Sequence, residues 1–250
     1  MLHMSIMAII MLILGTVSTQ AQSYLINIRQ IDGNQLSFVT SKVDSIWFDN
    51  VEPECVDLGL SVKWATFNIG ASAPDDYGDY YAWGETSTKS SYTWENYRFN
   101  PSGDSYYKVK FSKYNTQSDR GTVDDKTTLE MIDDIARQKW GGSWRMPTTD
   151  EFAELLNNCT WTWSTYNGFK GYIITSNKSG YTDRSIFLPA AGFSNFTTLG
   201  AGEGEYGYYM SSSLNASNPY EACFLFFSSN NHKTGKDFRY YGQSVRPVCP

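Results

Sequence analysis

The sequence predicts an α+β protein, with a small β-hairpin module followed by a larger domain of two helices and several antiparallel strands. Two stretches in the middle of the chain, 127–139 and 148–156, carry apolar residues at the helical period. Alternating, β-prone runs lie before and after them. An order of strand, two helices and then many strands is typical of α+β domains. The apolar share of 41% is enough for a core in a chain of 250 residues.

Residues 1–21 have the features of a secretory signal peptide. The run 6–17 is apolar except for Gly15 and Thr16, and it is too short to span a bilayer. A small-residue cleavage site precedes Gln22, although the first residues contain no Lys or Arg. The residue directly after the cleavage point is Gln22 and not a cysteine, so no lipid anchor is expected. We therefore expect a secreted, periplasmic or cell-surface protein without a transmembrane segment in the mature chain.

Residues 22–50 are predicted to form the small β-hairpin module. Asp32 and Gly33 are a hairpin-turn signal between two β-prone runs. An isolated hairpin is marginally stable in water, so the module is expected to dock on the main domain or on a partner. Residues 51–56 are interpreted as a linker, and 57–250 as the main domain.

The main domain is predicted to contain two helices. The first covers 127–139, where Leu129, Ile132 and Ile135 keep the helical period. The second follows Pro147, with Thr148 or Thr149 as its cap and Glu151 placed to reach back to the cap. Its apolar face consists of Phe152, Leu155 and Leu156.

Strands are expected on both sides of the helices. The polar stretch 86–123 between the first strand and the first helix is predicted to be a long surface insertion. Pro247 restricts the last strand to an edge or a terminal position. The predicted strands are 60–64, 172–175, 185–189, 206–213, 221–228 and 243–248.

Composition and motifs argue against several functional classes. A net charge of −6 and the absence of a basic run argue against nucleic-acid binding. His232 is the only histidine after residue 21, and no orienting partner lies near it in sequence, so it is not expected to be catalytic. The acidic run 75–85 could bind calcium through oxygen atoms, but a loop ahead of a buried strand is the favoured interpretation. We expect no metal, no cofactor and no enzymatic activity.

The run 142–152, Gly-Ser-Trp-Arg-Met-Pro-Thr-Thr-Asp-Glu-Phe, resembles a signature of formylglycine-generating-enzyme-like and C-type-lectin-like domains. It is more similar still to the secreted Bacteroidetes–Fibrobacter "major paralogous domain" proteins. The run 243–248 adds to this resemblance, which covers about 57–249. It implies a C-type-lectin-like fold for 57–250. Four cysteines allow three pairings, and because lectin-like folds bring their termini together, the resemblance favours a disulfide between Cys55 and Cys249.

The strand 221–228 suggests a binding surface. Leu225 and Phe227 share one face of the strand, and Phe224 and Phe226 share the other. If only one face meets the core, the two outer phenylalanines are exposed and need a partner; alternatively, both faces are buried between layers.

The residues that follow this strand are expected to form a polar and aromatic loop. Their mixture resembles an antibody paratope. It also resembles the variable region of lectin-fold proteins that retroelements diversify. The predicted ligand-binding residues are Tyr220, Glu221, Phe224, Phe226, Asn230, His232, Asp237, Phe238, Tyr240 and Tyr241.

These observations predict a secreted or surface-exposed recognition protein. Its ligand would be a glycan or a protein on a cell surface, bound non-covalently by ring stacking and hydrogen bonds. One alternative is a formylglycine-generating-like oxidase with a redox-active Cys223. Another is a structural or fimbrial surface component, in which the N-terminal hairpin adds a strand to a neighbour.

Overall fold

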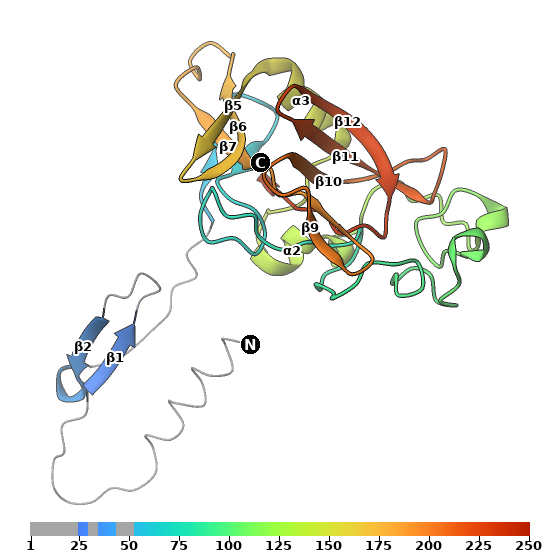
Figure 1. Ribbon diagram of the computed structural model, residues 1–250, viewed down its shortest axis with the longest axis horizontal. Helices are drawn as coiled ribbons and strands as arrows, with labels where there is room; N and C mark the ends of the chain where they lie inside the picture. Colours follow the sequence, from blue (N-terminus) through green and yellow to red (C-terminus); the bar gives the residue numbers. More distant parts are fainter. Residues whose placement is uncertain (1–24, 30–34, 44–52) are drawn as a thin grey trace, which may run out of the picture. The chain divides into compact units, whose positions relative to one another are not determined.

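Two units divide the chain, Met1–Val51 and Glu52–Pro250. The computed structural model describes residues 25–29, 35–43 and 53–250 (Figure 1). In the first unit, β1 (Leu25–Arg29) pairs antiparallel with β2 (Gln35–Val39), and a 3-10 turn (Thr40–Lys42) follows. The pairing agrees with the predicted hairpin. The predicted signal peptide and the turn at Asp32-Gly33 lie outside the described residues.

The second unit is built from short antiparallel sheets. The sheet β13-β4-β3 joins both ends of the unit, and β8 pairs with β9. Its other two sheets are β5-β6-β7 and β10-β11-β12. The bounds are β3 (Cys55–Val56), β4 (Lys63–Ala65), β5 (Cys159–Tyr166), β6 (Phe169–Ser176), β7 (Ser185–Pro189), β8 (Phe193–Asn195), β9 (Thr198–Ala201), β10 (Tyr206–Leu214), β11 (Glu221–Ser228), β12 (Asn231–Phe238) and β13 (Val248–Cys249).

The first predicted helix, 127–139, is wrong in length. A 3-10 turn (Met131–Asp133) precedes a six-residue helix, α2 (Ile135–Trp140). Asp134 sets this start, because its carboxylate accepts the backbone N–H groups of Arg137 and Met146. Two 3-10 turns, Tyr106–Lys108 and Ser118–Arg120, lie in the predicted insertion, and Thr128, inside the predicted helix, forms an isolated bridge with Ser213.

The second predicted helix is confirmed as α3 (Thr149–Asn158). Thr148 accepts the backbone N–H of Glu151, and the Glu151 carboxylate accepts the N–H of Thr148, which completes a capping box. Phe152 and Leu155 are fully buried, and α3 packs against β10, β11 and β12 (Figure 1). Among the described residues, no helix has the length and apolar character needed to cross a bilayer.

The predicted fold class is wrong. Strands make up 38% of the described residues and helical segments about 13%, with two α-helices among them, so the protein is β-rich. The expected two-helix, C-type-lectin-like α+β arrangement of residues 57–250 is therefore corrected. One cause is the short α2. Another is β12, which pairs with β11 along its whole length where a loop was predicted. In place of the predicted strand 243–248, the structure has isolated bridges at Gln243 and Ser244 and the short strand β13.

Two hydrophobic cores lie on opposite faces of the β10-β11-β12 sheet. On one face, Tyr209, Leu225 and Phe227 pack with α3 and the β5-β6-β7 sheet. On the other face, Met210 and Ala222 pack with aromatic residues of the stretch 81–114. The predicted surface insertion therefore supplies much of a core. Its buried side chains include Tyr92, Trp94, Tyr97, Phe99, Val109, Phe111 and Tyr114.

Two fully buried arginines connect distant segments through backbone carbonyls. Arg246 donates to the carbonyls of Ala65, Thr66 and Phe187 and to the Asn68 side chain. Burial lowers the pKa of Arg246 to about 10.

Arg239 is held in the same way. It donates to the Tyr97 hydroxyl and to the carbonyls of Lys113, Tyr114 and Pro219. Its guanidinium also lies 4.4 Å from the ring centre of Phe111.

The predicted Cys55–Cys249 disulfide is wrong. Cys55 lies on β3 opposite Ala65, and Cys249 lies on β13 opposite Lys63, so β4 separates them. Two strand spacings alone separate their Cα atoms by at least about 10 Å, whereas a disulfide needs less than about 7 Å. No disulfide joins any of the four cysteines, all of which lie in the described residues.

The capping box provides a test of this architecture. Replacing Thr148 by Ala should lower the free energy of unfolding by about 1 kcal/mol, because the Glu151 N–H loses its acceptor. Urea denaturation of the full chain measures the change. Thr148→Ser keeps the hydroxyl and should stay within a few tenths of a kcal/mol. Equal losses for both variants would contradict the capping role.

Candidate functional site

The β10-β11-β12 sheet has an aromatic face that is partly open to solvent. Tyr208 on β10 lies opposite Phe226 on β11, and the two rings are 5.1 Å apart. Tyr206 stacks on Phe226 at 6.1 Å. As the alternation predicted, Leu225 and Phe227 point the other way and are fully buried. The outer positions of two neighbouring strands thus form one row of rings.

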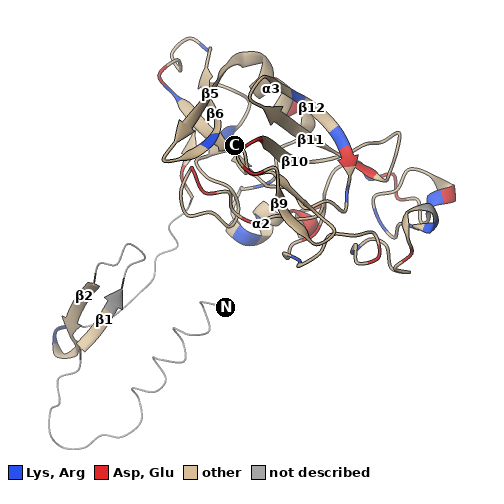
Figure 2. Ribbon diagram, in the orientation of Figure 1, with Lys and Arg blue, Asp and Glu red and all other residues tan. Residues whose placement is uncertain are grey.

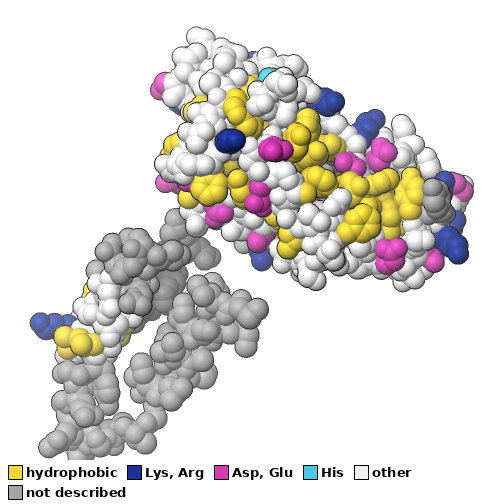
Figure 3. Space-filling view, in the orientation of Figure 1, with side chains coloured by type: hydrophobic (Ala, Val, Ile, Leu, Met, Phe, Trp, Pro, Cys, Tyr) yellow, Lys and Arg dark blue, Asp and Glu magenta, His cyan; other side chains and the backbone are white. Residues whose placement is uncertain are grey.

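Rings from two other segments extend this row. Phe193 of β8 lies 4.8 Å from Tyr208 and 5.6 Å from Tyr241, and Tyr241 lies 5.7 Å from Phe238. All of these rings are partly or largely exposed, and Figure 3 shows a hydrophobic band over this part of the unit with acidic side chains beside it. We call this set the aromatic strip. It consists of Phe193, Tyr206, Tyr208, Phe226, Phe238 and Tyr241.

Phe224, which was expected to be exposed, is buried. Only 7% of its surface is accessible, because Tyr208 stacks on it at 5.6 Å. On its other side lies Gly235 of β12, where a Cβ atom would come within 2.9 Å of the ring. Tyr220 and Tyr240 are also buried, at 5% each. These three buried residues contact the rings of the aromatic strip or pack next to them, and the alternative interpretation, burial on both faces of the sheet, is correct for them.

Two predicted site residues do not join the strip. His232 pairs with Phe227 and lies on the opposite face of the sheet, where its ring stacks on Trp161 at 4.9 Å. Burial in that stack lowers the pKa of His232. Asn230 lies in the turn between β11 and β12, where its amide oxygen accepts the Ser228 hydroxyl. The sequence alone could not place them, because the pairing of β12 was not predicted.

Charged groups border the strip on β11 and β12, where basic and acidic positions lie close together (Figure 2). Asp237 is half-buried opposite Ala222, and burial, together with the negative charge of Glu221, raises its pKa. Glu221 accepts a hydrogen bond from Asn215 at 2.8 Å. Lys233 lies 6.0 Å from the Phe226 ring centre. The strip therefore combines ring faces with hydrogen-bond acceptors and a cation.

Several strip residues were not predicted. Tyr206 and Tyr208 alternate with buried residues along β10, so the period of that strand was the signal that could have identified them. Phe193 could not be found in this way, because it belongs to the separate short strand β8. Trp94 and Tyr106 of the insertion lie 5.9 and 5.1 Å from Phe238, and no sequence signal connects them with it.

The described residues contain no group of three or more His, Cys, Asp or Glu side chains that could hold a metal ion. Burial raises the pKa of Cys159 to about 11, so its thiol stays protonated at neutral pH. Cys223 is buried in β11. The groups that the strip presents are suited to stacking and hydrogen bonding.

Burial distinguishes the supporting rings from the surface rings. Phe224→Ala should lower the free energy of unfolding by about 3 kcal/mol, since it removes a buried ring beneath Tyr208. Tyr206→Ser removes a ring that is 39% exposed and should change stability by about 0.5 kcal/mol or less. Chemical denaturation compares the two, and equal effects would contradict this division.

The raised pKa of Asp237 predicts a pH dependence. A raised pKa means that the folded state favours the protonated carboxyl over the ionised one. The free energy of unfolding therefore falls as the pH rises and Asp237 ionises. Asp237→Asn should therefore stabilise the protein at pH 7 and have little effect near pH 3. The exposed Asp183→Asn serves as the control. Urea denaturation at both pH values decides, and an equal effect of Asp237→Asn at both would contradict the prediction.

No protein-family model, no curated protein and no solved structure matches this chain. The function of the aromatic strip is therefore inferred from its geometry alone. The resemblance of the run 142–152 to secreted major paralogous domain proteins therefore stays a prediction.

Proposed function

We propose that this protein is a secreted or surface-exposed recognition protein that binds a glycan non-covalently along the aromatic strip. One observation carries the proposal: rings from β8, β10, β11 and the end of β12 contact one another in a row and remain partly exposed. Contiguous exposed apolar surface of this kind is typical of an interaction site.

The strip is held rigidly before any ligand arrives. Tyr208 rests on Phe224, and Phe224 in turn lies over Gly235. Tyr240 packs 4.6 Å from Tyr241 and stacks on Phe238 at 5.8 Å. Because these rings already have fixed positions, binding costs little side-chain entropy.

The chemistry of the strip favours a glycan over other polymers. The face of an aromatic ring is electronegative and attracts the C–H groups on the face of a sugar ring. The carboxylate of Asp237 lies on the same face of the sheet as Phe226 and near Tyr208, and it can accept hydrogen bonds from sugar hydroxyls. A protein partner would desolvate this carboxylate, and the cores of protein interfaces are depleted in charge. Nucleic acid is disfavoured because the net charge of −6 would repel its phosphates.

The resemblance of the run 142–152 supports placing this chain with the secreted major paralogous domain proteins, and residues 1–21 support export. Both points rest on sequence, and residues 1–21 lie outside the described residues. An exported protein meets glycans at cell surfaces, which fits a binding surface that needs neither cofactor nor covalent chemistry.

A glycan array with matched variants tests the proposal. The double variant Tyr206→Ser/Phe226→Ser should weaken binding to array-positive glycans by about tenfold or more, since each ring contributes about 0.5–1.5 kcal/mol. The control is Tyr166→Ser/Phe169→Ser, which removes two rings from the tip of the β5-β6 hairpin that are 42% and 36% exposed. It should bind as the unaltered chain does.

Two results would overturn the proposal. One is an array on which the unaltered chain binds nothing, together with tight capture of a protein partner that the double variant loses. The other is glycan binding that the strip variant and the control variant weaken equally. Thermal unfolding of each variant confirms that it is folded.

A further inference from the structure

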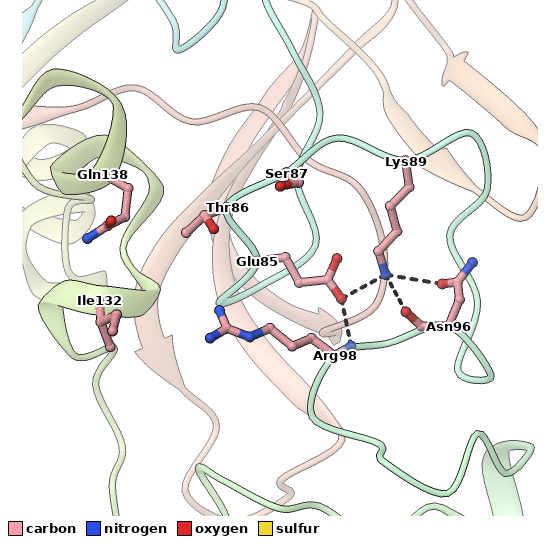
Figure 4. A pocket seen from close by; sticks show the side chains of 8 residues that line it. All are labelled: Glu85, Thr86, Ser87, Lys89, Asn96, Arg98, Ile132 and Gln138. Carbon is pink, nitrogen blue, oxygen red and sulfur yellow. Dashed lines mark hydrogen bonds and ion pairs between the residues drawn. The ribbon is translucent and has the colours of Figure 1, made fainter.

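A second candidate site lies away from the rings of the strip. A pocket of about 420 Å³ opens between the stretch 85–98 and the segment that carries the 3-10 turn Met131–Asp133 and α2 (Figure 4). Its volume is within the range of small-molecule sites. Its polar lining distinguishes it from the strip.

A buried carboxylate forms part of the pocket wall. Glu85 is only 5% exposed, and its Oε1 accepts the Lys89 ammonium and the backbone N–H of Arg98, both at 2.7 Å. Figure 4 shows the second oxygen of Glu85 pointing away from both donors. Glu85 therefore has one oxygen that is held in place and another that can accept a hydrogen bond from a ligand.

The charges at the pocket are already paired. Lys89 uses its three N–H donors on Glu85 and on two oxygens of Asn96. Nη1 of Arg98 donates to the Gly84 carbonyl and lies 3.0 Å from Asp133. An ionic ligand would thus meet no unmatched charge of opposite sign.

Neutral hydrogen-bonding groups remain. The amide nitrogen of Gln138 donates to the Met131 carbonyl, which leaves its oxygen as an acceptor. Thr86 and Ser87 contribute hydroxyls to the lining. Beside these neutral groups, the charged Arg98 has two further donor nitrogens, Nε and Nη2. Ile132, 64% exposed, adds an apolar side chain to the wall.

We propose that this pocket binds a small neutral polyhydroxylated molecule, such as a monosaccharide or another polyol. Each hydroxyl of such a ligand both donates and accepts, and therefore suits a wall that mixes carboxylate, amide, hydroxyl and guanidinium groups. The side chain of Ile132 can contact the C–H groups of the ligand. The inference does not depend on the strip.

Saturation-transfer NMR on the full chain tests the pocket, with D-glucose, D-galactose, D-mannose and myo-inositol as neutral probes and gluconate and glucosamine as charged ones. At least one neutral probe should bind with a dissociation constant on the order of millimolar, and more tightly than either charged probe. Ser87→Trp, which places a large side chain in the lining of the pocket, should abolish this binding. Ser90→Trp, an exposed position in the same loop that does not line the pocket, should not.

A conservative substitution controls for misfolding of the Trp variants. Thr86→Val removes one hydroxyl with little change in shape and should weaken binding about threefold to tenfold. The strip variant Tyr206→Ser/Phe226→Ser should keep the monosaccharide binding, which separates this test from that of the proposed function. The inference is overturned if no neutral probe binds, if the charged probes bind more tightly, or if folded Ser87→Trp and Ser90→Trp bind equally.

Discussion

The buried guanidinium of Arg239 is the interaction on which the binding region depends. It follows directly after β12, and it donates to the Tyr97 hydroxyl, 142 residues away, and to carbonyls at Lys113 and Tyr114. A buried cation is stable only when its donors are satisfied, and a missing partner costs several kcal/mol. The polar insertion must therefore fold back against the end of β12. The ring of Phe111 beside the guanidinium adds a cation–π contact.

This constraint explains how one segment can serve two surfaces. The stretch 91–99 carries Trp94, which packs 4.8 Å from Tyr240 beneath the strip, and Asn96 and Arg98, which line the polar pocket. Tyr97 lies between them and donates to the Trp83 carbonyl. Since buried contacts fix this segment, both surfaces have their shape before a ligand binds.

Structural features that depend on residues close together in sequence could be predicted. Thr148 and Glu151 stand three residues apart after a proline, and they form the predicted capping box. Leu225 and Phe227 lie on one face of β11, as the period of the strand required, and both are fully buried. The first helix was overestimated because Asp134 binds two backbone N–H groups and starts the helix late. The spacing of apolar residues carries no information about such side-chain hydrogen bonds to the backbone, so it cannot predict where they start a helix.

Contacts within a few residues specify the cap of α3, the extent of β11 and the placement of Leu225 and Phe227 on one face of that strand, so the amino-acid sequence was sufficient to predict them. The β-rich fold, the burial of Phe224 and the position of His232 depend on contacts between segments that are distant in sequence. The polar run after Ser228 becomes a strand because β11 offers an open edge to pair with. That pairing places Gly235 against Phe224 and turns His232 toward Trp161. Cross-strand pairing joins residues that are not neighbours in sequence, so side-chain alternation alone could not predict which rings would be covered.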